Sequence, residues 1–112
     1  MCLFCKIISR EIPAKVLFED DDLLAFADIR PVAPTHALVI PKRHIESLNV
    51  AASSDAELLG KLLLAARRIA QEAGIAETGW RAVANTGPQA GQSVFHVHVH
   101  VLGGRDMAWP PG

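Results

Sequence analysis

The sequence predicts an α+β domain built around an antiparallel sheet of about five strands. Five short apolar segments have the character of strands, one long amphipathic helix is expected before the last two, and a short helix is expected near the N-terminus. Strands that follow one another without alternating helices are typical of antiparallel α+β folds. With 112 residues, half of them hydrophobic, the chain (residues 1–112) is expected to form a single domain around a modest core.

The first half of the chain contains the short helix and three strands. The helix is expected over residues 4–10 and must end before Pro13, because a proline disfavours helical backbone at the residue before it. The strands are expected at residues 16–19, 23–27 and 37–40. The acidic run 20–22 predicts a turn, so the first two strands should form a hairpin. The third strand is continuously apolar up to Pro41, which predicts a central position in the sheet.

The second half contains the long helix and the last two strands. Ser54 and Glu57 have the spacing of a capping box, which predicts the start of the helix, and Gly74 is a suitable residue to follow its end. The apolar residues that recur at helical spacing are Leu58, Leu62, Ala65, Ala66, Ile69 and Ala73. Strands are expected at residues 80–84 and 94–102, joined by a glycine-containing loop over residues 85–92.

Three of the five histidines lie in one alternating run within the last expected strand. Side chains alternate between the two faces of a strand, so His96, His98 and His100 should share one face. The opposite face should pack on the core and carries Phe95, Val97, Val99 and Val101. Imidazole can act as a nucleophile, a general acid or base, or a metal ligand near neutral pH. Because ordinary polar residues would solvate a strand face more simply, the histidine row favours a chemical role.

A phosphorus centre is the reaction centre that suits this row. A neutral imidazole can attack phosphorus and form a covalent phosphohistidine, while neighbouring imidazoles stabilise charge on the phosphoryl oxygens. Closely spaced imidazoles cannot all be protonated at neutral pH, because like charges lower each other's pKa. The preceding residues Gly91, Gln92 and Ser93 offer backbone N–H groups and a hydroxyl to a bound anion. The row therefore predicts one neutral nucleophile beside cationic or hydrogen-bond-donating neighbours.

The run from His96 to Leu102 resembles the His-φ-His-φ-His-φ-φ signature of the histidine triad (HIT) superfamily, where φ is a hydrophobic residue. The resemblance covers nearly the whole chain and extends to the Hint branch, the histidine triad nucleotide-binding proteins. The other matching segments are residues 7–8, 11–15, 18–21, 25–26, 28–29, 34–36, 39–42, 44–45, 91–94, 101–105 and 109–112. The resemblance implies the HIT fold, with a sheet that continues across a homodimer and a C-terminal tail, residues 103–112, that reaches the partner.

The resemblance also implies an enzyme, a purine nucleoside phosphoramidase. Such an enzyme hydrolyses the P–N bond of AMP or GMP conjugated to an amine, through a covalent nucleotidyl-histidine, and requires no cofactor for catalysis. Matched by position, His98 is the nucleophile, and His100 and His36 orient and stabilise the phosphoryl group. The backbone of His96 fixes the tautomer of His98, and Ser93 bonds the phosphate or the leaving amine.

The implied nucleotide site draws on residues from much of the chain. Asp28 is expected to bind the ribose hydroxyls, Asn85 to support the phosphate loop, and Trp109 to reach the site of the other subunit. The residues expected to wall the base are Phe4, Ile7, Phe26 and Ile29. The phosphate is expected to meet the loop residues Gly91, Gln92, Ser93 and Val94, together with His98 and His100.

Charge and hydropathy argue against several other partners. The formal net charge is −1 and no long basic run occurs, so nothing predicts binding to nucleic acid or to an acidic membrane surface. No apolar run approaches the roughly 20 residues of a membrane-spanning helix, and no signal peptide is recognised. A cytoplasmic protein is therefore expected, whose partners are purine nucleoside monophosphate conjugates and a second copy of itself.

Two interpretations of the N-terminal cysteines stay open. Cys2 and Cys5 form a C-x-x-C motif that, with His44 and His96, supplies the ligand types of a tetrahedral structural zinc site. The resemblance supports zinc, since several triad proteins with this motif hold the ion in this way, but the animal Hint pattern lacks both cysteines. Alternatively, both residues are free thiols, because a reducing compartment disfavours a structural disulfide.

Three other functions remain compatible with the sequence. The first is a nucleotide-binding regulatory or scaffold protein with residual hydrolysis, although the triad and Ser93 are complete. The second is a metalloenzyme whose ligands are the histidine row, although no Asp or Glu lies in that strand to complete the set. The third is a dinucleoside polyphosphate hydrolase or a nucleotidyl transferase, and the retention of His100, where the transferase branch carries Gln, disfavours transfer.

Overall fold

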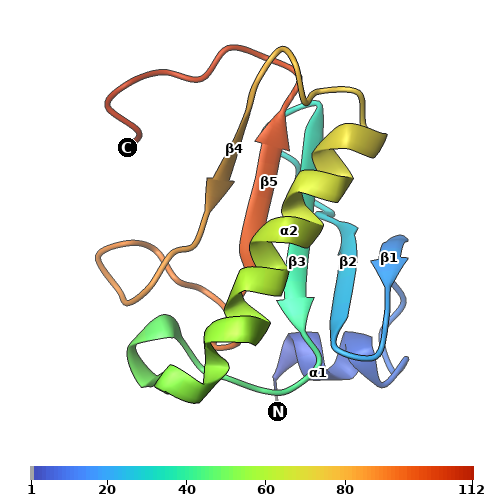
Figure 1. Cartoon of the computed structure of the whole chain (residues 1–112), viewed down its shortest axis with the longest axis vertical. Helices are drawn as coiled ribbons and strands as arrows, with labels where there is room; N and C mark the ends of the chain where they lie inside the picture. The colour runs from blue at the N-terminus through green and yellow to red at the C-terminus, as the bar shows by residue number, and fades with distance from the viewer. Residues whose placement is uncertain (1) are drawn as a thin grey trace.

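The computed structural model describes residues 2–112 and contains one five-stranded antiparallel sheet with two helices (Figure 1). In chain order the elements are α1 (Leu3–Ile8), β1 (Val16–Glu19), β2 (Leu23–Ala27), β3 (Thr35–Pro41), α2 (Ala56–Glu72), β4 (Trp80–Val83) and β5 (Val99–Gly103). Two short 3₁₀ turns, Leu48–Val50 and Ser53–Asp55, precede α2. The strands lie in the order β1-β2-β3-β5-β4, so β3 is central, and the predicted α+β class is confirmed.

The sheet separates two apolar clusters, one on each face. On one face, α2 packs across β3 and β5 (Figure 1). The strands and the segment just before β5 contribute the following residues to this cluster: Leu23, Ala25, Ala37, Val39, Val97, Val99 and Val101. The other face packs against α1, and its cluster consists of Phe4, Ile7, Leu24, Phe26, Leu38 and Ile40. Because side chains alternate along a strand, successive residues of β2 and β3 belong to different clusters.

Most of the predicted apolar stripe of α2 is confirmed. Leu62, Ala65, Ala66 and Ile69 are buried, whereas Ala73 is exposed and Ala70 is buried in its place. The outer face of the helix carries two apolar side chains, Leu63 and Leu64, each 55% exposed. Within residues 2–112, no helix combines the length and the apolarity that crossing a membrane requires.

The start of α2 shows that the predicted capping box of Ser54 and Glu57 is wrong. The helix begins directly after Asp55, whose carboxylate accepts a 2.8 Å hydrogen bond from the backbone N–H of Ala52. The same carboxylate pairs with the guanidinium of Arg43. Asp55 is buried, so these two partners are needed to satisfy its oxygens. The S-x-x-E pattern was misleading because the helix begins after Asp55 and not after Ser54. The charged partner of Asp55 is Arg43, which lies on a different segment of the chain.

The last strand is shorter than predicted. Sheet pairing in β5 begins at Val99, because the N–H of Val97 instead donates to the carbonyl oxygen of Ile45 at 2.7 Å. The expectation that Phe95 packs on the core is wrong, since 65% of its surface is exposed. Val97, Val99 and Val101 are buried as predicted. The remaining bounds differ by a few residues, with α1 at Leu3–Ile8, β3 extended to Thr35 and Pro41, and β4 ending at Val83.

The end of α2 confirms the role expected of Gly74. This residue has a φ of +75°, and its N–H donates to the carbonyl oxygen of Gln71 at 3.1 Å. The N–H of Ile75 donates to the carbonyl oxygen of Ala70 at 3.0 Å, which completes a Schellman motif. The motif turns the buried side chain of Ile75 against Gly103 at the end of β5.

Two glycine substitutions should change stability in opposite directions. A Cβ at Gly103 would overlap the side chain of Ile75, so Gly103→Ala should lower the free energy of unfolding by about 1–3 kcal/mol. Gly60 lies within α2 with open space around it, so Gly60→Ala should raise the free energy of unfolding by about 0.5–1 kcal/mol. Urea unfolding followed by circular dichroism measures both, and an unchanged midpoint for Gly103→Ala would contradict the packing argument.

Candidate active site and metal-ligand cluster

His98 is held in the tautomer that a nucleophile requires. Its Nδ1 lies 2.7 Å from the backbone carbonyl oxygen of His96. A carbonyl oxygen only accepts hydrogen bonds, so Nδ1 carries the proton and Nε2 keeps an unshared electron pair. His98 is buried, and the ring of Phe4 meets its ring edge-to-face at a centroid distance of 5.1 Å. These contacts fix both the proton and the orientation of the imidazole.

A second chain of hydrogen bonds fixes His36 and His100. The backbone N–H of Val32 donates to Nδ1 of His36 at 3.1 Å, which leaves the ring proton of a neutral His36 on Nε2. That Nε2 lies 2.9 Å from Nδ1 of His100 and 3.3 Å from a carboxylate oxygen of Asp28. Since His100 accepts at Nδ1, its own proton lies on Nε2. The rings of His98 and His100 have centroids 5.0 Å apart, so a nucleophilic nitrogen and a hydrogen-bond donor lie side by side.

The protonation of His100 follows from its surroundings. Burial, together with the neighbouring His98 and His36, lowers the pKa of His100 to about 4, although Asp28 acts in the opposite direction. His100 is therefore neutral at pH 7 and offers an anion a hydrogen bond rather than a charge. This matches the prediction that a row of imidazoles is not uniformly protonated.

A cavity of about 380 Å³ opens beside His98 and His100. Of the residues expected to contact a nucleotide, it brings together Phe4, Ile7, Phe26, Asp28, Ile29, Ser93 and Val94 with these two histidines. Ile29 is 90% exposed and forms the rim, whereas the two phenylalanines are buried. The cavity therefore combines an apolar slot with a carboxylate, a hydroxyl and two imidazoles, a combination typical of small-molecule sites.

The loop before Ser93 is shaped by a side chain that turns inward. Gln92 is buried, its Oε1 accepts from the N–H of Gly87 at 3.1 Å, and its Nε2 donates to the carbonyl oxygen of Glu46 at 2.8 Å. The side chain of Gln92 thus supports the loop, and it does not line the cavity. Asn85 and Gly91 belong to the same loop and also lie outside the cavity lining.

The C-terminal tail runs beside β4, at the edge of the sheet (Figure 1). Nη2 of Arg81 on β4 donates to the carbonyl oxygen of Ala108 at 2.9 Å. The next residue, Trp109, is 82% exposed and does not line the cavity of its own chain. Its contact with the site of a partner subunit stays a prediction.

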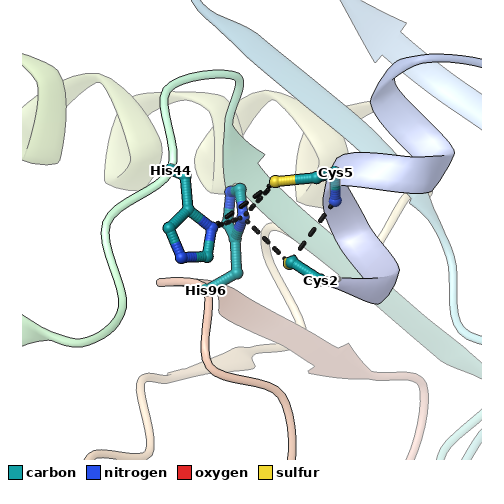
Figure 2. Close-up of side chains that lie close together, drawn as sticks. All are labelled: Cys2, Cys5, His44 and His96. Atoms are coloured by element: carbon teal, nitrogen blue, oxygen red, sulfur yellow. Dashed lines mark hydrogen bonds between the residues drawn. The ribbon is translucent and has the colours of Figure 1, made fainter.

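Four potential metal ligands converge beside α1. They are Cys2, Cys5, His44 and His96, and one ligand atom of each lies within 4.8 Å of the others (Figure 2). The Nδ1 atoms of His44 and His96 are 3.1 Å apart. Sγ of Cys2 lies 3.4 Å from Nδ1 of His96, and Sγ of Cys5 lies 3.4 Å from Nδ1 of His44. Two thiols and two imidazoles are a ligand set of structural zinc sites.

The protonation of these side chains fits a cation. Nε2 of His96 donates to the carbonyl oxygen of Pro41 at 2.7 Å, so the lone pair of the neutral ring lies on Nδ1, which faces the thiols. Burial lowers the pKa of His96, which favours this neutral form. Burial raises the pKa of the Cys5 thiol, and its contacts with Cys2 add to the shift. A bound cation would oppose that rise by stabilising the thiolate.

The histidine row does not converge on one metal position. His96 faces the cysteines, whereas His98 and His100 line the cavity. Asp28, His36 and His100 form a second group with ligand atoms within 4.8 Å of one another. In this group, however, Nε2 of His36 carries the proton that it shares with its neighbours, so it has no free lone pair. This hydrogen bonding disfavours the metalloenzyme hypothesis.

Sequence reasoning missed the two backbone groups that fix histidine tautomers outside the triad strand. They are the N–H of Val32, which bonds His36, and the carbonyl of Pro41, which bonds His96. Backbone groups have no side-chain signature in a sequence. The only signal was that proline restricts both segments, residues 31–34 and the end of β3.

The chain is similar to known proteins over nearly its whole length. The HIT domain family matches residues 9–107. An uncharacterized HIT-like protein of Synechococcus elongatus is 54% identical over 110 residues, covering 98% of this chain and 96% of the relative. Adenylylsulfatase HINT1 of Arabidopsis thaliana is 52% identical over 112 residues, covering 98% of this chain and 76% of the relative. A HIT family hydrolase structure from Legionella pneumophila covers 100% of both chains at 54% identity, with a TM-score of 0.98.

The chain therefore belongs to the histidine triad family. Within that family it is related to the Hint branch, as the similarity to the Arabidopsis thaliana protein shows.

The free energy of unfolding should decrease as the pH falls from about 6.5 to about 4. The pKa of His100 is lowered from its ordinary value of 6.5 to about 4 in the folded protein, so unfolding takes up a proton in this interval. His100→Gln removes that proton uptake while the neighbouring His36, His98 and Asp28 remain. Urea unfolding at a series of pH values should therefore give a shallower decline for the variant than for the wild type. Parallel profiles would contradict the neutral state assigned to His100.

Proposed function

We propose that this protein hydrolyses phosphoramidates of purine nucleoside 5′-monophosphates through a covalent nucleotidyl intermediate on His98. The observation that carries the proposal is the tautomer of His98, whose Nε2 lone pair lies at a cavity with a carboxylate, a hydroxyl and an apolar slot. A neutral imidazole of this kind is a competent nucleophile. Family membership supports the proposal, as does the description of the Legionella pneumophila relative as a hydrolase.

The reaction consists of two displacements at phosphorus. In the first, Nε2 of His98 bonds to phosphorus while the P–N bond breaks, and the amine leaves with a proton that the exposed Ser93 hydroxyl relays from solvent. In the second, water bonds to phosphorus, the bond to His98 breaks, and the proton of the water passes to solvent. The intermediate imidazole is cationic because Nδ1 keeps its proton, and the carbonyl of His96 stabilises this charge.

Hydrogen-bond donors lie where the phosphoryl oxygens gain charge. His100 and Ser93 both line the cavity with His98, and the rings of His98 and His100 have centroids 5.0 Å apart. A positioned donor of this kind contributes roughly 3 kcal/mol to transition-state stabilisation. Because His100 is neutral, its contribution does not depend on the loss of a proton near pH 7.

The remainder of the cavity suits a nucleoside. Phe4 and Phe26 are buried and pack edge-to-face at a centroid distance of 5.6 Å, which gives a planar base an apolar wall. Oδ1 of Asp28 accepts the N–H of Arg30 at 2.8 Å, which holds the carboxylate in place to accept hydrogen bonds from ribose hydroxyls. A base slot beside a ribose-binding carboxylate favours a nucleotide over a simple phosphate ester.

A second substrate class differs only in the leaving group. The Arabidopsis thaliana relative carries the name adenylylsulfatase, and loss of sulfate from an adenylyl group would form the same intermediate on His98. The hollow on the open side of Ser93 is lined by Cys2, His44, Glu46 and Phe95, and Glu46 is the one carboxylate among its lining residues, which favours an amine leaving group in this chain. A carboxylate attracts an ammonium group and repels sulfate.

The first test compares wild-type protein with His98→Ala on AMP conjugated to a lysine-like amine. The wild type should release AMP, and the variant should lose at least about 10³-fold in rate because it has no nucleophile. AMP binding measured by calorimetry should persist in the variant, since the base and ribose contacts are retained. Chromatographic separation of AMP from the conjugate measures the rate.

The outcomes separate the alternatives. Wild-type protein that binds AMP but releases none from the amine conjugate, from adenylyl sulfate or from a dinucleoside polyphosphate would favour a binding or scaffold role. Faster release of AMP from adenylyl sulfate or from the polyphosphate would show that this compound, and not the phosphoramidate, is the preferred substrate.

We also propose that Cys2, Cys5, His44 and His96 bind one structural zinc ion. The support is the convergence of their ligand atoms and the free lone pair on Nδ1 of His96. When bound, the ion supplies cross-links between segments, and no step at His98 requires it. The alternative of free thiols does not account for the convergence of two thiols and two imidazole nitrogens within 4.8 Å of one another.

Zinc analysis by mass spectrometry tests this site. Wild-type protein loaded with zinc and then desalted should contain about one ion per chain, and Cys5→Ser should lose most of it because a thiolate ligand is missing. Lys6→Ala is the matched control, since it alters the next residue of α1 without removing a ligand. Wild-type protein that emerges from desalting without zinc would sink the proposal.

We further propose a homodimer in which β4 of each chain lies at the interface. Among residues 2–112, β4 pairs only with β5 and so presents an unpaired edge, which favours pairing with another strand. The tail beside β4 carries the exposed Trp109, and the outer face of α2 carries the exposed Leu63 and Leu64. Tails that leave at β4 would cross to the partner in such an assembly, where Trp109 could approach the partner's cavity.

A further inference from the structure

Helix α1 connects the cysteine–histidine cluster to the nucleotide cavity. Cys2 precedes this helix and Cys5 lies in its first turn, while Phe4 between them is buried and lines the cavity. We infer that metal binding at the cluster positions Phe4 and thereby raises the affinity of the cavity for a nucleotide. The inference rests on the proposed zinc site and nucleotide site, and it makes both cysteines positioning residues for nucleotide binding.

α1 is too short to keep its conformation unaided. It contains six residues, whereas isolated helices shorter than roughly 12–15 residues are marginal in water. Its apolar anchors are Phe4 and Ile7, which pack in the cluster on the α1 face of the sheet. Its other attachment is the ligand cluster, where Sγ of Cys2 also accepts the N–H of Cys5 at 3.4 Å. The position of Phe4 therefore depends on its own packing in the apolar cluster and on the two cysteines that flank it.

A shared ion would tie α1 to the sheet on both sides of Phe4. His44 follows β3 and His96 precedes β5, so the two imidazoles belong to the segments that carry the sheet. The two cysteines come from the N-terminal segment (Figure 2), and in the sequence one precedes Phe4 and the other follows it. Bonds from one ion to all four ligands would hold Phe4 in place before a nucleotide arrives. A site that is ordered in advance binds more tightly, because the ligand does not have to order it.

Phe4 contacts the groups that a nucleotide would meet. Its ring centroid lies 5.6 Å from that of Phe26, 5.1 Å from that of His98 and 5.9 Å from that of His96. Displacement of Phe4 would therefore remove one wall of the base slot and the packing against the nucleophile together. A metal site with a local stabilising role alone would leave these contacts unchanged.

Coupling between the two sites must be reciprocal. If zinc raises the affinity for AMP by a given factor, then AMP raises the affinity for zinc by the same factor. The effect of AMP on zinc affinity can be measured without any hydrolysis, and the measurement can begin from zinc-loaded protein. It is therefore independent of the proposed phosphoramidase activity.

The experiment measures both directions of the coupling on the wild-type chain. Calorimetry gives the dissociation constant of AMP for zinc-loaded and for chelator-treated protein, and circular dichroism confirms that each is folded. Competition with a chromophoric chelator gives the affinity for zinc with and without AMP. We expect AMP to bind about 10-fold more tightly to the loaded protein, and zinc about 10-fold more tightly in the presence of AMP. The chelator measurement gives the factor even if the zinc-free chain unfolds.

Two variants show whether the coupling runs through Phe4. Phe4→Leu keeps all four ligands but shortens the side chain that reaches Phe26 and His98. It should bind zinc as the wild type does, while the coupling factor falls toward unity. Lys6→Ala changes a residue of α1 that does not line the cavity and should keep the full coupling factor.

Each result decides a different statement. Equal AMP affinities for folded protein with and without zinc, or a zinc affinity that AMP does not change, would overturn this inference and leave the zinc site intact. Wild-type protein that binds no zinc would overturn the zinc proposal and this inference with it. Zinc-loaded protein that binds no AMP would overturn the nucleotide site and this inference together. Full coupling in Phe4→Leu would overturn the assignment to Phe4.

Discussion

The hydrogen bond between Nδ1 of His98 and the carbonyl oxygen of His96 determines what the rest of the site can do. This 2.7 Å contact removes Nδ1 from the chemistry and leaves Nε2 as the only nucleophilic atom of the ring. The same residue, His96, donates from Nε2 to Pro41 and turns Nδ1 toward the cysteines. One buried residue thus fixes the nucleophile through its backbone and the metal-ligand cluster through its side chain. Its position is in turn set by the end of β3, to which Pro41 belongs.

The carbonyl oxygen of His96 is free to bond His98 because the histidine run joins the sheet only at Val99. If residues 94–98 continued the ladder of β5, the carbonyl of His96 would have been a candidate for pairing with a neighbouring strand. Instead, Val97 bonds to the segment after β3, and regular pairing starts at Val99. The irregular entry therefore gives His98 its partner and exposes Phe95 at the surface. The cost is a strand of five residues, Val99–Gly103, which the neighbouring β3 supports along its length.

The sequence was sufficient for features that depend on the type and spacing of side chains. The antiparallel sheet, the central strand and the burial of Val97, Val99 and Val101 followed from hydrophobic periodicity. Similarity to a known signature indicated the histidines and cysteines of both candidate sites, and the structure brings them into two groups. The sequence could not predict hydrogen-bond or ion-pair partners that are backbone atoms or that lie on another segment of the chain. The Val32 N–H that fixes His36 and the Arg43 that pairs with Asp55 are examples, because tertiary structure alone decides which groups meet.

The division of the sheet into two clusters constrains how the length of this chain can change. Along β3, Val39 and Ala37 face α2, whereas Leu38 and Ile40 face α1, and His36 lies on that second side beside His100. Insertion of one residue within β3 would move each side chain on one side of the insertion to the opposite face of the sheet. The imidazole of His36 would then enter the apolar cluster beneath α2. The length of β3 is thus tied to the proposed catalytic site as tightly as the identity of its residues is. Gains and losses of residues are expected to collect instead in the loops, such as the stretch between β3 and α2.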